Sequence, residues 1–140
     1  MLLLDASVLV ELVVEGEHVN AADRLLDRYA SDPTLVLVTA AHGLVEAISA
    51  LRGLTRAGVL ITEQARAAVT WLADLNVILD PSGLRLPHIW ELRDRMSAYD
   101  AAYAAAAAAL DIPLLSSDRR LLDACAQAGV PASHLEDFVG

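Results

Sequence analysis

The stretch from Tyr99 to Asp118 reads Tyr-Asp-Ala-Ala-Tyr-Ala-Ala-Ala-Ala-Ala-Ala-Leu-Asp-Ile-Pro-Leu-Leu-Ser-Ser-Asp. Alanine is the best helix former, so the run predicts a helix, and Leu114–Ser116 after the break predicts a short buried strand. Asp100 then lies in the first turn of the helix, and Asp118 lies just past the strand. In an open parallel sheet, ligands bind outside the carboxyl ends of the strands. The two acids therefore mark half of a candidate site, provided that other elements bring further carboxylates there.

The rest of the chain alternates short apolar runs with amphipathic helical patterns. Further strands are predicted at Met1–Leu4, Thr34–Val38 and Val77–Leu79, with a weaker signal for an edge strand in the tail Val130–Gly140. Helices are predicted at Ala6–Val14, Glu17–Ala30, Ala41–Arg56, from a Thr62 cap through Leu72, at Leu84–Arg95 and at Asp118–Ala128. This alternation predicts an α/β fold: a central parallel sheet of four or five short strands with helices on both faces, in three layers. We expect one domain over residues 1–140.

Composition excludes several classes of protein. The net charge of −9 argues against nucleic-acid binding through a broad basic face. All ten basic residues are arginine, and the missing lysine removes Schiff-base chemistry and the P-loop. No apolar run reaches the ~18 residues of a membrane helix, and acids interrupt the apolar N-terminus, so neither a membrane span nor a signal peptide is expected. The single Cys125 suits a reducing cytoplasm and is interpreted as core filling.

Four acids are candidates for the site, and each also has a purely structural interpretation. Asp5, after the first strand, could simply cap the following helix. Glu46 lies off the apolar stripe of its helix, on the side of His42 and Ser49, and could belong to a solvated face. Asp100 could complete a capping box with Ser97. Asp118 opens the last helix, although either preceding serine could cap it.

Two other kinds of residue are set aside. Asp80 also follows a strand, but Pro81 and Gly83 favour a role in a turn. The four histidines lack the spacing of a zinc site.

The order and contexts of the four acids resemble those of a known family. Asp5-Ala-Ser-Val-Leu, Glu46-Ala-Ile-Ser-Ala-Leu, Tyr99-Asp100-Ala-Ala-Tyr and Leu114-Leu-Ser-Ser-Asp118-Arg-Arg-Leu together resemble PIN domains, and more closely the VapC-type toxins of toxin–antitoxin pairs. The resemblance spans essentially the whole chain. Ser116 stands where the family often has Thr, and Asp111 replaces a common Gly, but no departure removes a carboxylate.

The resemblance implies a PIN-like fold and endonucleolytic cleavage of RNA. It implies that Asp5, Glu46, Asp100 and Asp118 are the catalytic and metal-binding residues, with Ser7 and Ser116 supporting them and Arg93 contacting RNA phosphate. Oxygen ligands without cysteine or histidine select Mg²⁺, or Mn²⁺, over zinc. The implied partners are a cognate VapB-type antitoxin, the RNA substrate and a second copy of the chain.

Three hypotheses remain open at this point. The first is a metal-dependent ribonuclease toxin held inactive by its antitoxin. The second is a non-catalytic interaction module on the same fold, against which the retained acids count. The third is a different Mg²⁺-dependent hydrolase, such as a phosphatase, which the absence of lysine and of an Asp-x-Asp motif disfavours.

Overall fold

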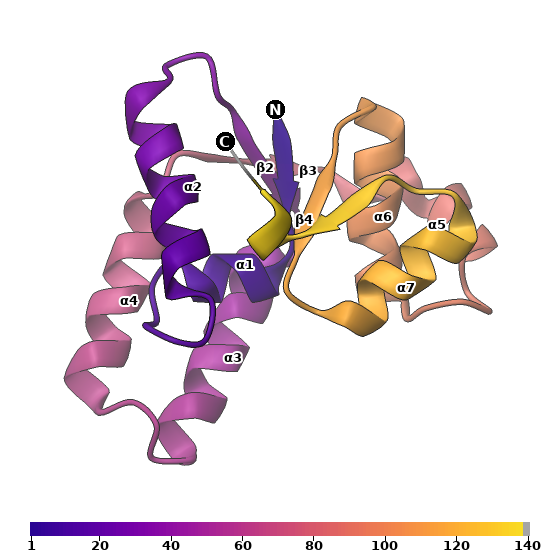
Figure 1. The fold of residues 1–140 in the computed structure, drawn as a ribbon. Helices are drawn as coiled ribbons and strands as arrows, with labels where there is room; N and C mark the ends of the chain where they lie inside the picture. The colour runs from indigo at the N-terminus through magenta and orange to yellow at the C-terminus, as the bar shows by residue number, and fades with distance from the viewer. Residues whose placement is uncertain (139–140) are drawn as a thin grey trace.

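A five-stranded parallel sheet forms the centre of the computed structural model, which describes residues 1–138 (Figure 1). The strands are β1 (Leu2–Leu4), β2 (Leu37–Ala40), β3 (Val77–Asp80), β4 (Leu114–Ser116) and β5 (Ala132–His134). Their order across the sheet is β3-β2-β1-β4-β5. The chain therefore adds β2 and β3 on one side of β1, and then β4 and β5 on the other side. The strand order therefore reverses between β1 and β4, and a crevice at such a switch point is where open parallel sheets bind ligands.

Helices cover both faces of this sheet, which confirms the predicted three-layer α/β fold. The first group is α1 (Ala6–Glu11), α2 (Val19–Ser31), α3 (Gly43–Arg56) and α4 (Thr62–Asp74). The second is α5 (Leu86–Glu91), α6 (Ala98–Leu110) and α7 (Arg119–Ala128), with single 3₁₀ turns at Ser82–Arg85 and Leu135–Asp137. Figure 1 shows α2, α3 and α4 to one side of the sheet and α5, α6 and α7 to the other.

The alanine helix α6 lies deep in the molecule. Its residues from Ala101 to Ala107 are all buried, and it contacts β1, β2 and β4 as well as α5. Small side chains allow this close packing, and Tyr103 is the one large residue in the buried run. Cys125 is buried on α7, and burial raises the pKa of its thiol to about 11, in keeping with core filling. Helix α6 thus fixes the position of its first turn, where Asp100 lies.

Two predicted strands need correction. The second strand is Leu37–Ala40 rather than Thr34–Val38, because Thr34 takes part in a local turn. Its N–H and Oγ1 both donate to Asp32 Oδ1, at 2.9 and 2.6 Å, which holds it out of the sheet. The third strand extends one residue further than predicted, to Asp80. The weakly predicted edge strand exists as β5, whereas Val139 and Gly140 lie outside the described residues.

Several predicted helices also need correction; α3, for example, begins at Gly43 rather than at Ala41. The pattern over Leu84–Arg95 is broken into a 3₁₀ turn and the short helix α5, and Arg93 and Arg95 follow in tight turns that bond to Trp90 and Leu92. Helix α1 ends at Glu11 instead of Val14, and α2 covers Val19–Ser31 instead of Glu17–Ala30. Thr62 is the first helical residue of α4 rather than its cap; Gln64 accepts the N–H of Ile61 instead. Propensity alone does not locate the ends of helices to within one or two residues.

Glycine at position 43 is required by a close approach between α3 and β2. A Cβ added there would meet Thr39 Oγ1 at 2.1 Å, and that hydroxyl donates to the carbonyl of Leu4 at 2.7 Å. Thr39 is fully buried, so it has no free space into which to turn. The helix that carries Glu46 therefore begins directly against the end of the sheet.

The Gly43→Ala variant is expected to lower the free energy of unfolding by about 1–3 kcal/mol, because the added methyl overpacks the contact with Thr39. Gly53 on the same helix has nothing within 4 Å of an added Cβ, so Gly53→Ala is the matched control. That control should stabilise by roughly 0.5–1 kcal/mol through helix propensity. Urea unfolding measures both, and equal effects of the two changes would contradict the close contact.

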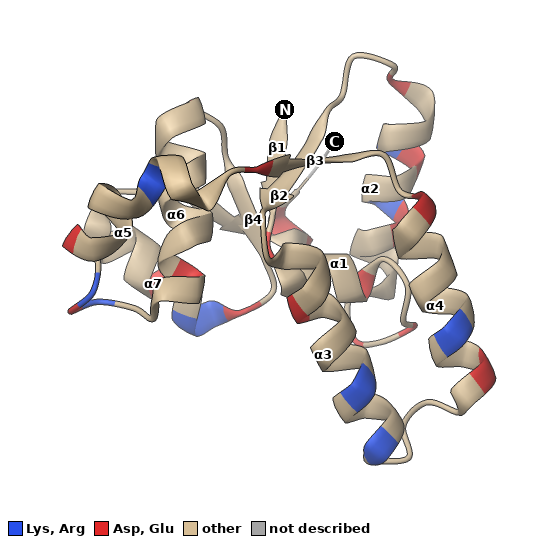
Figure 2. Ribbon diagram, turned by 180° about the vertical axis from the view of Figure 1, so that it is seen from behind, with Lys and Arg blue, Asp and Glu red and all other residues tan. Residues whose placement is uncertain are grey.

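Charge is distributed in small groups over the surface. In Figure 2 the basic residues lie in separate short stretches, on α2, α3 and α4, around α5 and at the start of α7, without a broad basic face in that view. Within residues 1–138, no helix is both long and apolar enough to cross a membrane. Because the basic residues are scattered in this way, any binding of a polyanion would depend on individual arginines.

Candidate active site

Asp5 is the buried centre of the candidate site. It follows β1, the middle strand, and caps α1 by accepting the N–H of Val8 at Oδ1 (3.1 Å). Two serine hydroxyls also donate to it, Ser7 to Oδ1 at 2.6 Å and Ser116 to Oδ2 at 2.5 Å. Burial raises the pKa of Asp5 to about 6, the charge of Asp118 adds to this, and the hydrogen bonds oppose it. The capping interpretation of Asp5 is thus confirmed, yet capping engages only one of its two oxygens.

The two serines join the ends of β1 and β4. The hydroxyl of Ser7 accepts the N–H of Ser117, and that of Ser116 accepts the N–H of Asp118, both at 2.9 Å. The two hydroxyls lie 3.3 Å apart. Side chains that follow β1 and β4, the two strands between which the strand order reverses, therefore form one hydrogen-bond network around Asp5.

Asp118 caps α7 itself, which corrects the prediction that one of the preceding serines could do so. Its Oδ1 accepts the N–H groups of Arg120 and Leu121 at 3.0 and 3.4 Å, and the helix begins at Arg119. Its other oxygen, Oδ2, lies 4.0 Å from the exposed guanidinium of Arg120. The charge of Asp118 raises the pKa values of both Asp5 and Asp100, so the three acids form one electrostatic group.

Glu46 projects from α3 and is held by two aromatic neighbours. Its Oε2 accepts a hydrogen bond from the hydroxyl of Tyr103 at 3.3 Å and lies 3.2 Å from Nε2 of His42. Burial, together with the Glu46 charge, raises the pKa of Tyr103 above its usual range, so this phenol remains a donor. The interpretation of Glu46 as part of a simply solvated face is therefore wrong, although its side chain is partly exposed.

Asp100 lies half-buried in the first turn of α6. Its N–H donates to the hydroxyl of Ser97 at 3.1 Å, so Ser97 is the N-cap, as predicted. Burial raises the pKa of Asp100 first, and the charge of Asp118 raises it further, while Arg120, Ser97 and His42 oppose the shift. Burial and the charge of Asp118 therefore disfavour the carboxylate form of Asp100, and the charge of Arg120 favours it.

A cavity of about 400 Å³ brings Glu46 and Asp100 together. It is lined by His42, which precedes α3, and by Val45, Glu46 and Ser49 of α3; by Ser97, which caps α6, and Tyr99 and Asp100 of α6; and by Arg120 of α7. Sequence reasoning placed Glu46 on the side of His42 and Ser49, and all three do line the cavity. It missed Tyr103 and the ring contacts of His42; the i, i+4 spacing of His42 and Glu46 was the available signal.

The donor set suits a hard divalent cation, although it is not assembled around one. Among residues 1–138, no three Asp, Glu, His or Cys side chains come close enough together to hold a metal ion. Mg²⁺ typically takes only one or two protein carboxylates and keeps several waters. The mutual repulsion of Asp5, Asp100 and Asp118 is what a bound cation would relieve.

Two further predicted residues lie outside this arrangement. The Arg93 guanidinium lies over the Trp90 ring, 4.5 Å from its centroid, and donates to the Trp90 carbonyl; it does not line the cavity. Asp80, which was assigned to a turn, is the buried last residue of β3 and forms a two-bond ion pair with Arg85. Asp80 is therefore structural, but through an ion pair that the sequence pattern did not predict.

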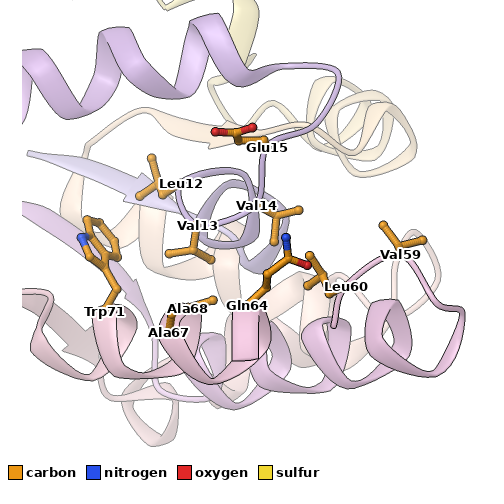
Figure 3. Close-up of a pocket in the computed structure, with 10 residues that line it drawn as sticks. All are labelled: Leu12, Val13, Val14, Glu15, Val59, Leu60, Gln64, Ala67, Ala68 and Trp71. Atoms are coloured by element: carbon orange, nitrogen blue, oxygen red, sulfur yellow. The ribbon is translucent and has the colours of Figure 1, made fainter. Parts of the chain in front are cut away.

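A second, larger cavity of about 540 Å³ lies away from the four acids. Figure 3 shows it between the segment that follows α1, with Leu12 and Val13, and the face of α4 that carries Ala68 and Trp71. Glu15 is the only acidic residue that lines it. With a single carboxylate and no basic side chain among its lining residues, this cavity does not resemble a metal or phosphate site.

The parallel sheet with acids at its switch point defines the class of protein. A family model described as the PIN domain matches residues 2–127, and the chain belongs to the PIN domain family. Among curated proteins, the chain is similar to Ribonuclease VapC1 of Mycobacterium tuberculosis, with 42% identity over 83 residues that cover 59% of this chain and 60% of that protein. It is also 34% identical to Ribonuclease VapC9 of the same organism over 126 residues, which cover 88% of this chain and 90% of the relative.

Two solved structures share the fold. VapC20 of Mycobacterium tuberculosis, described as a sarcin–ricin loop cleaving toxin, has a TM-score of 0.66 at 22% identity, covering 93% of this chain and 96% of its own. A protein of Pyrobaculum aerophilum has a TM-score of 0.69 at 24% identity, with 96% and 90% covered. At such identities the likeness concerns the fold alone.

Proposed function

We propose that this protein is a metal-dependent endoribonuclease toxin that cleaves RNA phosphodiester bonds and is inhibited by a cognate VapB-type antitoxin. The observation that carries the proposal is the buried Asp5 at the end of the central strand, close enough to Asp118 that burial and, to a smaller extent, the charge of Asp118 raise its pKa to about 6. Relatives named VapC ribonucleases support the same activity. A non-catalytic module could use Asp5 and Asp118 as helix caps, but it would gain nothing from the repulsion among Asp5, Asp100 and Asp118.

In this proposal Asp5, Glu46, Asp100 and Asp118 hold Mg²⁺, with Mn²⁺ as an alternative. The bound cation would polarise the scissile phosphate and activate a water molecule. Ser7 and Ser116 fix the rotamer of Asp5 through their hydrogen bonds, and Tyr103 fixes that of Glu46. Arg120, exposed beside the acids, is placed to contact phosphate. Arg93 is a more distant phosphate contact.

The test of the activity uses the purified chain and a mixture of cellular RNA. We expect cleavage with Mg²⁺ or Mn²⁺ and none after chelation with EDTA. Cleavage that persists in EDTA, or intact RNA with every divalent ion tried, would overturn the proposal. A phosphatase, the other Mg²⁺-dependent hydrolase considered, would release inorganic phosphate from phosphomonoesters instead.

The metal-binding part is tested by melting temperature. A ligand present at a hundred times its dissociation constant stabilises by about 2.7 kcal/mol, so Mg²⁺ should raise the melting temperature of the wild type by several degrees. The Asp100→Asn variant should show a clearly smaller rise, since one carboxylate of the set is lost. Asp123→Asn, an exposed acid on α7 outside the cavity, is the matched control and should respond like the wild type. Equal rises in all three proteins would remove Asp100 from the metal site.

We further infer a homodimer, with β3 and α5 as its interface. The supporting observation is a set of exposed apolar side chains there: Ile78, Leu79, Leu84, Leu86 and Trp90. β3 is also an edge strand of the sheet. Light scattering of the wild type and of Leu86→Arg tests this: we expect a dimer that the added charge converts to a monomer.

A further inference from the structure

The cavity beside the acids is also lined by an exposed aromatic side chain, Tyr99, which has no role in the proposed metal binding. Tyr99 leaves 68% of its surface exposed, although it lies next to the half-buried Asp100. Its ring is supported by His42, at 5.5 Å between centroids and 61° between ring planes. His42 in turn lies 4.8 Å from the ring of the buried Tyr103. The exposed ring of Tyr99 is therefore held in place by His42, which in turn contacts Tyr103.

The surroundings of Tyr99 match the chemistry of a nucleotide. The other walls of the 400 Å³ cavity provide the hydroxyls of Ser49 and Ser97 and the guanidinium of Arg120. Arg120 belongs to the α7 wall, and its side chain is 86% exposed at 4.0 Å from Asp118. A phosphate placed at the acids and Arg120 would leave the attached base at the Tyr99 side of the cavity. Aromatic rings in such positions stack on bases regardless of sequence.

We propose that Tyr99 is the stacking platform for a nucleobase of single-stranded RNA, next to the phosphate that is cleaved. The inference rests on the proposed ribonuclease activity and deepens it by assigning the position of one base. His42 is a positioning residue in this scheme because it supports the ring of Tyr99 and lies between it and Tyr103. A stack of this kind requires an unpaired base, so the substrate is a single strand or a loop rather than a duplex.

The experiment measures binding separately from cleavage. Fluorescence anisotropy follows a labelled single-stranded RNA oligonucleotide on the Asp5→Asn protein, in EDTA, so that the RNA stays intact during the measurement. Adding Tyr99→Ala should weaken binding roughly tenfold, because stacking on an aromatic side chain is lost. Tyr99→Phe keeps the ring and should bind within about twofold of the parent. Trp71→Ala, which removes an exposed aromatic side chain on α4 outside this cavity, is the control and should leave binding unchanged.

A second oligonucleotide with abasic residues separates stacking from a change in folding. Tyr99→Ala should have no further effect on it, since there is no base to stack. Equal losses on both oligonucleotides, or no loss on either, would overturn the assignment of Tyr99. Unchanged RNA binding with a weakened antitoxin complex would instead assign Tyr99 to the protein partner and also overturn it. If the wild type cleaves RNA while Tyr99→Ala binds it normally, this inference alone fails; if the wild type cleaves no RNA, the proposed function fails.

Discussion

Replacing Asp5 with asparagine is expected to lower metal-dependent RNA cleavage by roughly a hundred- to a thousandfold while leaving the fold intact. Asp5 is the most buried of the four acids and lies at the end of the central strand, where the networks from β1 and β4 meet. Asparagine has nearly the same shape and keeps one oxygen for the N–H of Val8. It cannot neutralise a cation, so the loss should fall on activity.

Cleavage rates at saturating Mg²⁺ measure this effect, with circular dichroism to verify folding. Asp123→Asn removes one negative charge from the exposed side of α7, and it should cleave RNA at the wild-type rate. Comparable activity of Asp5→Asn and the wild type would remove Asp5 from the catalytic set. A similar loss in both variants would indicate that overall charge, rather than the site, limits the reaction.

The same variant should change how stability depends on pH in the absence of metal. The pKa of Asp5 is about 6 in the folded protein, above its ordinary value of 3.8, so the folded state binds more protons between these values. Wild-type stability therefore falls as pH rises from about 4 through 6. Relative to Asp5→Asn, we expect the wild type to lose roughly 2 kcal/mol between pH 4.5 and 8. Urea unfolding with EDTA at both pH values measures this, and parallel pH dependences would contradict the raised pKa.

The sequence predicted those parts of the site that follow from the order of strands and helices. Leu114–Ser116 and the alanine run were sufficient to place Asp100 in the first turn of a helix and Asp118 just past a strand. These inferences depend on local periodicity and on the rule that parallel strands end at the same edge. They required no knowledge of side-chain contacts.

The contacts that hold Glu46 could not be predicted in this way. The hydrogen bond that Glu46 accepts comes from the hydroxyl of Tyr103. Tyr103 is 57 residues away in the sequence and lies in a helix that consists mostly of alanine. Periodicity reports how far a residue is from the apolar stripe, and Glu46 is indeed off the stripe. Whether the side chains beyond that stripe face solvent or another helix depends on how α3 and α6 pack. The sequence of one helix does not contain that information.

The prediction for Asp80 was incomplete for a different reason: the residues that follow it predict the turn but not the ion pair that the turn forms. Pro81 and Gly83 correctly indicate a turn after β3. That turn brings Arg85 back onto Asp80, with Nη2 2.9 Å from Oδ1 and Nε 3.2 Å from Oδ2. The side chain of Asp80 is only 4% exposed and that of Arg85 is 20% exposed. A short turn has thus placed a carboxylate inside the protein together with its counter-ion.

Arg85→Ala is therefore expected to lower the free energy of unfolding by roughly 3 kcal/mol, since it leaves a buried carboxylate without its partner. Arg120→Ala is the control: its guanidinium is exposed and 4.0 Å from Asp118, so its removal should change stability by less than about 0.5 kcal/mol. The double variant Asp80→Asn with Arg85→Ala should regain much of the loss, because no buried charge remains. Urea unfolding at pH 7 measures all three. If the double variant were as unstable as Arg85→Ala, the loss would come from the packing of the arginine stem rather than from the unpaired charge.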